Sequence, residues 1–408
     1  AFGKLWVIAF RDLGRNRRRT GFTLIGVALG MMVLILMSGF IAGVFDSILE
    51  DSIRLQTGHL QLRAETYQEE KVSLQWGDLL ENPGQVADGI QTLEKVQSAT
   101  PILWASGRVS TIQESAGVQL TGIDPNSSIH DHLQVGLVSG EYLTPEGRGD
   151  LLMGRRLAEA MEIGVGQKVH LSVGNADGQL EEGIFTVKGL FSTGFPGYDE
   201  NTILLPISQL QAFTGAGDRS SAIVIMLHER SDADEVGAAL GGQGLDILTW
   251  EEMNSVVLTA VETGITFYYL MYAIVILVVA VIIANTLLMA VFERTREIGI
   301  LAALGMKKRQ ILSMFLLESV SLALIGILIG VLLGSALVFY FSNTGINIGE
   351  STASIAGDMM LGTNLYTKLA VSNVVSLSIW MLAIIVLVSL YPAWYAARLE
   401  PVKALRAL

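Results

Sequence analysis

The sequence predicts a membrane protein with four transmembrane α-helices and a large α+β extracytoplasmic domain inserted between helices 1 and 2. Two observations predict this fold class. First, 51% of the 408 residues are apolar and only 16% are charged, with a mean hydropathy of +0.49, whereas soluble domains carry about 25% charged residues. Second, the apolar residues are concentrated in four long segments, and a polar stretch of about 218 residues separates the first segment from the second.

The four apolar segments are long enough to span a membrane. Residues 22–44, 263–292 and 369–397 contain no charged side chain, and residues 311–341 contain one, Glu318. A helix of 23 residues is roughly 34 Å long, and the hydrocarbon core of a bilayer is about 30 Å thick. The first segment follows a basic stretch, but it exceeds the roughly 7–15 apolar residues of a cleaved signal peptide. We therefore expect an uncleaved anchor, with cleavage as the alternative.

The basic residues predict the orientation of these spans. Fourteen of the 27 Lys and Arg residues lie before the first segment, between the second and third, and after the fourth. Short basic flanks face the cytoplasm, so both termini are expected there. The polar insert carries 12 basic and 32 acidic residues and falls on the other side. We expect the four spans at 21–45, 263–292, 311–341 and 369–397. On the cytoplasmic side we expect an amphipathic N-terminal helix at 1–20, a helix at 293–310 and a tail at 398–408. On the outer side we expect the large domain with its stalk helices at 46–262 and a short loop at 342–368.

The polar insert reads as an α+β domain. Alternating or β-branched runs bounded by Gly, Asn and Asp predict strands, and short amphipathic runs predict helices. The expected strands are 59–62, 118–121, 168–173, 184–187 and 222–227, and the expected helices are 155–162, 207–213 and 233–240. Residues 46–56 and 250–262 are expected to extend the first two membrane helices as a stalk.

Several chemistries are excluded or disfavoured by the sequence. The chain has no Cys, so disulfides, thiol nucleophiles and Cys-bound metals are ruled out. It contains no GxxxxGK[ST] phosphate loop, GxSxG elbow or HExxH motif, and its net charge of −12 disfavours a nucleic-acid partner. His130 and His132 flank Asp131, but two imidazoles are too few for a zinc site, and we expect a solvated loop. We therefore expect the chain to have no catalytic residue, no bound metal and no enzymatic activity of its own.

Small residues and one acid stand out within the apolar segments. Glycines at every fourth position line one face of a helix and allow another helix to approach closely; a sliding interface is the functional alternative. These glycines are Gly26, Gly30, Gly39, Gly43, Gly326, Gly330 and Gly334. Glu318 is an intramembrane carboxylate, which by default suggests function. It could instead pair with a basic group near the membrane surface, and the sequence leaves both roles open.

The loop at 293–310 combines charge with an apolar stripe formed by Ile298, Ile300, Leu301 and Leu304, and Gly305 is placed to end a helix. We expect a short amphipathic helix, which either lies on lipid headgroups or fits a partner's groove.

At this loop the chain resembles a known family. Residues 293–306 (ERTREIGILAALGM) are similar to the coupling-helix signature of FtsX-like/MacB-type ABC permeases, and so are residues 9–20, 314–319 and 391–406. Residues 57–63 (TGHLQLR) and 195–206 (FPGYDENTILLP) look most like the lipoprotein-releasing (Lol-type, LolC/LolE-like) branch. Many MacB-type members have a basic residue where this chain has Ala302 and Ala303, so the details of docking are expected to differ.

The resemblance implies a permease subunit in the bacterial cytoplasmic (inner) membrane with its large domain periplasmic or extracellular. Such a subunit works by mechanotransmission with an ABC ATPase dimer, which binds ATP and Mg, and with a second permease that is an identical or a sister chain. Only 21 residues precede the first apolar segment, so a separate ATPase chain is expected. A periplasmic chaperone or adaptor and membrane lipid are further implied partners; the chain itself holds no cofactor.

The implied function is extraction of lipoproteins or a similar amphiphile from the outer leaflet. The alternatives are MacB-like efflux of small molecules or peptides, and FtsX-type signalling that activates a cell-wall hydrolase. By resemblance, the ATPase contacts are Arg294, Arg296, Glu297, Ile298, Gly299, Leu304 and Gly305. The positions that match the acyl-chain contacts of the Lol-type branch are Met37, Phe40, Val44, Phe267, Leu270 and Met271.

Overall fold

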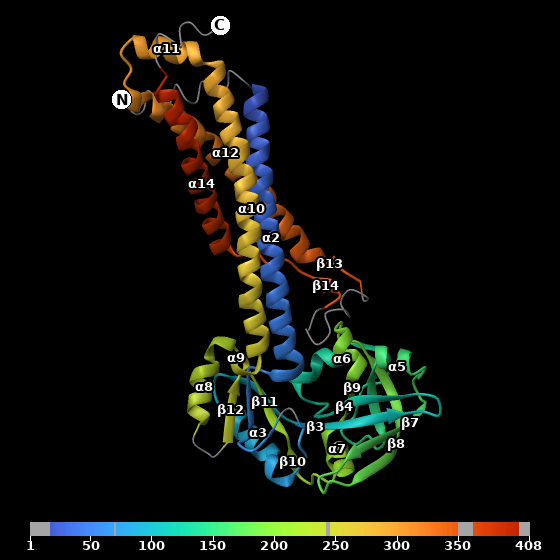
Figure 1. Cartoon of the computed structure of the whole chain (residues 1–408). Helices are drawn as coiled ribbons and strands as arrows, with labels where there is room; N and C mark the ends of the chain where they lie inside the picture. Colours follow the sequence, from blue (N-terminus) through green and yellow to red (C-terminus); the bar gives the residue numbers. More distant parts are fainter. Residues whose placement is uncertain (1–16, 69–70, 242–244, 350–361, 400–408) are drawn as a thin grey trace. The chain divides into compact units, whose positions relative to one another are not determined.

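A computed structural model describes residues 17–68, 71–241, 245–349 and 362–399 in two compact units (Figure 1). The membrane unit comprises the described parts of residues 1–45, 261–346 and 365–408. The sheet domain comprises the described parts of residues 46–260 and 347–364. The expected amphipathic helix at the N-terminus lies largely outside the described residues, as does most of the C-terminal tail.

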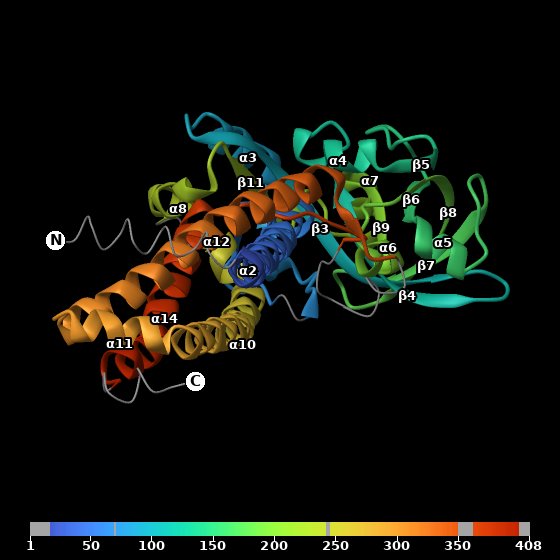
Figure 2. The same cartoon turned by 90° about the horizontal axis from the view of Figure 1, so that it is seen from above.

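Four long helices form the membrane unit, as the sequence predicted. They are α2 (Arg17–Ser52), α10 (Ser255–Glu293), α12 (Lys308–Thr344) and α14 (Val371–Ala397), and in the described part of the chain these four are long and apolar enough to cross a membrane. α2 and α10 begin or end within the sheet domain. α11 (Thr295–Ala303) connects α10 to α12. Figure 2 views α2 nearly along its axis, with α12 and α10 on two sides of it.

The core of the membrane unit is built from all four helices. Val27 and Met31 of α2 pack in one buried cluster with Ile283 of α10, Ile327 of α12 and Met381 of α14. Many other large apolar side chains of these helices are exposed, as expected for surfaces that face lipid tails, where exposure carries no hydrophobic cost.

Glycines bring the helices into close contact. A Cβ atom at Gly330 of α12 would lie 2.6 Å from the backbone oxygen of Ala28 in α2, and one at Gly334 would lie 2.9 Å from the Cβ of Ile35. At Gly39 of α2 it would lie 2.7 Å from Val338 of α12. Real Cβ atoms do not approach this closely, so these positions require glycine for the helices to touch.

The sheet domain contains one ten-stranded mixed sheet. Its order is β12-β1-β11-β3-β4-β9-β6-β8-β5, with β7 pairing β3 and β8. The strands are β1 (Leu60–Ala64), β3 (Val96–Ser110), β4 (Ser115–Ile123), β5 (Leu137–Gly140), β6 (Asp150–Gly154), β7 (Lys168–Gly174), β8 (Leu180–Phe191), β9 (Thr202–Pro206), β11 (Ala222–Leu227) and β12 (Leu245–Thr249). Two further pairs are β2 (Leu80–Glu81) with β10 (Arg219–Ser220), and β13 (Ile346–Asn347) with β14 (Asn364–Leu365).

Among the described residues, the short α-helices that accompany this sheet are α3 (Pro83–Gln91), α4 (Asp131–Val135), α5 (Arg155–Ala160), α6 (Pro196–Asn201), α7 (Ile207–Thr214), α8 (Ala233–Leu240) and α9 (Trp250–Met253). The predicted strands correspond to β1, β4, β7, β8 and β11, and the predicted helices to α5, α7 and α8. Dense aliphatic clusters, such as Leu103, Leu120, Leu151 and Ile203, are fully buried among them.

β3 was not predicted, although it is the longest strand. Its first part pairs with β11 through Val96–Ile102 and its second with β4 through Leu103–Ser110. The strand therefore joins the two halves of the sheet.

Helical segments lie at both chain connections of the sheet domain. α2 continues to Ser52 and is followed by a π-helical turn over Ile53–Thr57, while α9 and α10 supply the other flank. The hydroxyl of Ser52 donates a 2.6 Å hydrogen bond to the Oδ1 atom of Asn254, and both side chains are buried. This hydrogen bond fastens the two stalk segments together.

Candidate functional site

A cavity of about 550 Å³ opens between α2, α10 and α14 in the membrane unit. Its volume falls within the roughly 300–1,000 Å³ of small-molecule sites. The walls are mainly apolar and aromatic. The lining residues are Ser38, Ile41, Ala42 and Phe45 of α2, Val261, Ile265, Tyr268, Tyr269, Tyr272, Ala273 and Ile276 of α10, and Asn373, Ser376, Leu377, Trp380 and Ile384 of α14.

A few polar and aromatic groups contribute to the lining of this cavity. The Nδ2 group of Asn373 donates a 3.2 Å hydrogen bond to Ser38 Oγ, which joins α14 to α2. Phe45 and Tyr268 make an edge-to-face contact with ring centroids 6.2 Å apart. Tyr and Trp side chains are typical of the membrane–water interface. The cavity lining therefore combines apolar, aromatic and polar groups, which suits a hydrocarbon chain attached to a polar group.

The six expected acyl-contact residues lie on the same two helices but on neighbouring faces. Phe267, Leu270 and Met271 are exposed on α10, and Met37, Phe40 and Val44 are partly exposed on α2. The cavity lining within the described residues includes none of the six; it is formed by neighbours such as Phe45 and Tyr268. α10 is apolar on all sides, so sequence periodicity gave no signal for the face that turns toward the cavity.

The amphipathic helix expected in the loop at 293–310 is present as α11. Arg294 is its N-cap, and Gly305 follows with a φ of +92°, a left-handed conformation suited to glycine. Ile298 packs with Met314 and Phe315 of α12 in a buried cluster that also includes Ala393 of α14.

The seven expected ATPase contacts divide between two faces of this segment. Arg294, Ile298 and Gly299 are buried against the membrane unit. Glu297 is partly exposed, and the remaining three are exposed. Leu304 is 81% exposed, and Ile300 beside it is 43% exposed. The most exposed face of the segment, with Arg296, Leu304 and Gly305, is accessible to another protein.

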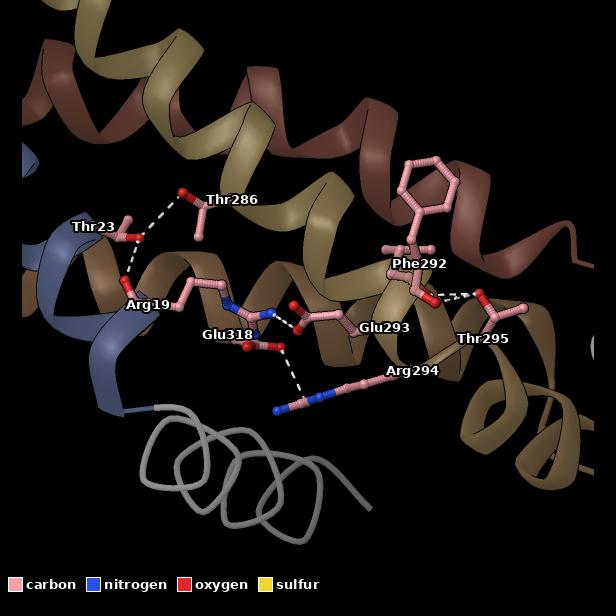
Figure 3. A network of polar contacts seen from close by, with 9 residues as sticks. Arg19, Thr23, Thr286, Phe292, Glu293, Arg294, Thr295 and Glu318 are labelled. Carbon is pink, nitrogen blue, oxygen red and sulfur yellow. Dashed lines mark hydrogen bonds and ion pairs between the residues drawn. The ribbon is translucent and has the colours of Figure 1, made fainter. Parts of the chain in front are cut away.

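Two ion pairs surround the start of α11 (Figure 3). Arg19 Nη1 of α2 donates to Glu293 Oε2 at the end of α10, at 2.7 Å. Arg294 Nη1 lies 4.0 Å from Glu318 Oε2 of α12, and both side chains are more than nine-tenths buried. Glu318 therefore has a basic partner, which is the structural alternative that the sequence left open.

His130 and His132 of the sheet domain lie in a short helical segment. Within the described ranges, no group of three His, Asp or Glu side chains could hold a metal ion. The expected solvated loop is wrong for His130, which is only 6% exposed. Burial lowers the pKa of His130 to about 3 and that of His132 to about 4. A helical turn over Ser128–Val135 places both imidazoles beside an apolar cluster that contains Ile129 and Leu133.

Comparisons with known proteins identify the class of this membrane protein. Residues 20–243 match the model of the MacB-like periplasmic core domain, and residues 269–401 match that of the FtsX-like permease C-terminal region. The first match alone spans more than half of the chain. The chain belongs to the FtsX-like/MacB-type family of ABC permeases.

Relatives from this family align along nearly the whole chain. The lipoprotein-releasing system transmembrane protein LolC of Xylella fastidiosa is 26% identical, over 96% of both chains. The lipoprotein-releasing system transmembrane protein LolE of Haemophilus influenzae is 25% identical, over 94% of this chain and 93% of its own length. The macrolide export ATP-binding/permease protein MacB of Nitrobacter winogradskyi is 24% identical, over 97% of this chain and 59% of its own length.

Proposed function

We propose that this chain is the permease subunit of an ABC transporter complex that extracts lipoproteins, or a similar amphiphile, from the outer leaflet of the bacterial inner membrane. The cavity between α2, α10 and α14 carries the proposal, because it offers an apolar volume bordered by aromatic and polar groups. Alignment with LolC and LolE over nearly the whole chain supports the same substrate class.

Moving an acyl chain from the bilayer into the cavity gains little hydrophobic free energy, because lipid tails are as apolar as the cavity walls. Binding in the cavity would therefore depend on shape and on the polar groups of its lining. The Ser38–Asn373 pair and the tyrosines at the rim provide hydrogen-bonding groups for the polar linkage that follows the acyl chain. Our proposal thus replaces the six expected acyl contacts by the cavity-lining residues as first candidates, with the six as the neighbouring lipid-facing surface.

In this proposal, ATP hydrolysis by a partner protein supplies the energy for release. We propose that a separate ATPase dimer binds ATP and Mg and docks on the exposed face of α11, where Arg296, Ile300 and Leu304 are accessible. The basic flanks favour cytoplasmic termini and a cytoplasmic α11, with the sheet domain in the periplasm. A second permease, identical or a sister chain, completes the complex, and a periplasmic chaperone or adaptor receives the cargo.

The test is ATP-dependent release of a fluorescent triacylated lipopeptide from proteoliposomes of phosphatidylethanolamine and phosphatidylglycerol that contain the complex purified with its native partners. Ala273→Trp fills the cavity from α10, and Leu270→Trp adds the same side chain one turn away, outside the cavity lining. We expect Ala273→Trp to reduce release at least tenfold and Leu270→Trp to leave it nearly unchanged.

Reduced release by Leu270→Trp but not by Ala273→Trp would favour the six residues expected from the sequence as the acyl-chain contacts. Equal release by both variants and the parent would show that the cavity does not bind the acyl chain during release. ATPase stimulation by a small molecule without lipopeptide release would favour the efflux alternative. A bound cell-wall hydrolase with no released species would favour signalling.

A further inference from the structure

The junction between α10 and α11 contains two consecutive residues of opposite charge, and each is paired with a different helix. Glu293 ends α10 and accepts from Arg19 of α2. Arg294 caps α11 and lies beside Glu318 of α12. Figure 3 shows these side chains converging from three helices toward one junction. We call this group of four residues the charge junction.

Burial makes the Arg294–Glu318 pair more than an incidental surface contact. Their side chains are 8% and 4% exposed, and Glu318 is the one charge in the apolar segment 311–341. Two charges in a low-dielectric interior are tolerated when each stays close to its counterion. Displacement of the start of α11 away from α12 would move these two charges apart in a low-dielectric interior, so the pair resists that separation.

Apolar packing reinforces the same connection. Ile298, one turn further along α11, is 2% exposed and packs with Met314 and Phe315, which precede Glu318 on α12. α11 is therefore fixed to α12 at two points, one ionic and one apolar. A force applied to its exposed face would move α11 together with the adjoining end of α12.

The other half of the charge junction connects α10 to α2. Besides the 2.7 Å contact between Arg19 and Glu293, Thr23 Oγ1 donates a 3.2 Å hydrogen bond to Thr286 Oγ1 about one turn further from the junction. The same two helices line the cavity through residues such as Ser38 and Tyr272. The ends of α2 and α10 near the charge junction are thus held together on the same helices that border the proposed substrate site.

We propose that the charge junction transmits displacement of α11 to α12 and α2, and that Arg294 and Glu318 are positioning residues for this coupling. The inference rests on the proposed function, since it needs a partner that pushes on α11. It assigns Arg294 an internal role in place of the ATPase contact expected from the sequence, and it assigns Glu318 the role of a counterion. It predicts that the start of α11 and the adjoining parts of α12, α10 and α2 move together.

The test measures coupling, defined as lipopeptide released per ATP hydrolysed, in the proteoliposome system with the complete complex. The variants are Arg294→Glu, Glu318→Arg and the double exchange, which restores opposite charges at reversed positions. Arg18→Glu is the matched control, because it makes the same change of charge on an exposed side chain next to Arg19. The thermal midpoint and the amount of bound ATPase are recorded for each complex.

We expect each single reversal to reduce the coupling ratio at least tenfold and the double exchange to recover a large part of it. Arg18→Glu is expected to leave both the bound ATPase and the ratio unchanged. The proposal is overturned if the single reversals keep the parental ratio. It is also overturned if the double exchange regains the parental midpoint and bound ATPase but not the ratio, because the pair would then serve stability alone. If the single variants fail to assemble, the double exchange decides the test. A double variant that assembles and couples supports the proposal. A double variant that fails to assemble or to couple overturns it.

A second measurement uses the absence of Cys from the chain. Thr23→Cys with Thr286→Cys places two thiols where the hydroxyl oxygens are 3.2 Å apart, so oxidation can lock α2 to α10 beside the charge junction. Joint movement predicts the same coupling ratio in the oxidised and reduced complexes. Loss of release on oxidation and recovery on reduction would show that the helices separate here and would overturn the proposal. Failure of the proposed function looks different, because the parent complex itself would then show no ATP-dependent release.

Discussion

The membrane unit and the sheet domain are stabilised in different ways. The sheet domain buries dense aliphatic clusters in which residues such as Leu103, Leu151 and Ile203 are fully inaccessible. The membrane unit also has a buried core, but close glycine contacts, an open cavity and a buried ion pair accompany it.

This difference follows from the surroundings of each unit. Water drives aliphatic side chains together in the sheet domain, whereas between membrane helices lipid tails are as apolar as the side chains they replace. Helix association then depends on shape and on polar contacts. The features proposed to bind and move a substrate all lie in the membrane unit.

The largest expected effect comes from breaking the buried ion pair. Glu318→Leu leaves Arg294 without its carboxylate neighbour on α12, and removal of one partner from a buried pair costs about 3–5 kcal/mol. We expect a clear fall in the unfolding midpoint of the detergent-solubilised complex. Arg294→Met combined with Glu318→Leu removes both charges and should recover most of this stability. A double variant as unstable as the single one would show that the pair is not what makes Glu318 important for stability.

Glycine packing gives the next largest effect. Gly330→Val places a branched side chain against the backbone oxygen of Ala28, which cannot move aside as a side chain could. Overpacking of this kind costs about 1–3 kcal/mol, and we expect α2 and α12 to separate, with a lower thermal midpoint. Gly21→Val is the matched control, since nothing lies within 4 Å of a Cβ at Gly21. Equal midpoints for the two variants would contradict the close approach of α2 and α12.

The buried imidazole of His130 makes the stability of the sheet domain depend on pH. Burial, assisted by His132, lowers the pKa of His130 to about 3, against about 6.5 in an unfolded chain. As the pH falls below 6.5 the unfolded chain takes up a proton and the folded one does not, so the folded state loses stability. The loss attributable to His130 is about 1 kcal/mol between pH 7 and pH 5.5.

Measurement of the unfolding midpoint of the full chain at these two pH values tests this expectation. His130→Gln should show a smaller loss than the parent, because the titrating group is gone. His170→Gln, at an exposed position of β7, should retain the parental loss. An unchanged pH dependence in His130→Gln would mean that protonation of His130 in the unfolded chain does not cause the loss of stability at low pH.

The sequence predicted the fold where each element carries its own local signal. Charge-free segments identified the four membrane helices, and alternation identified strands such as β7 and β11. β3 was missed because its pairing changes partner near Ile102, and its inward residues do not follow one alternation. The apolar stripe in a charged loop predicted the short helix that the structure shows as α11, and Gly305 marked where it ends.

The candidate site was only partly predictable, since it depends on how helices turn toward one another. Val44 and Phe45 are equally apolar in sequence, yet Phe45 lines the cavity and Val44 does not. Arg294 and Arg296 are likewise both basic residues of the same motif, but one is buried beside Glu318 and the other is exposed. His130 reads as a loop residue beside Asp131, and tertiary packing buries it. These assignments require three-dimensional contacts that local periodicity does not encode.

The smallest expected effect concerns the other half of the charge junction. Arg19 and Glu293 retain 18% and 39% side-chain exposure, so solvent already stabilises both charges, and pairs of this kind contribute about 0–1 kcal/mol. We expect Arg19→Gln to lower the unfolding midpoint far less than Glu318→Leu does, and added salt to reduce even that difference. Its effect on coupling should nevertheless exceed that of Arg17→Gln, an exposed position at the start of the same helix. Equal and large losses of stability for Arg19→Gln and Glu318→Leu would show that both ion pairs lie in the same low-dielectric interior. The Arg19–Glu293 pair would then be no more hydrated than the Arg294–Glu318 pair.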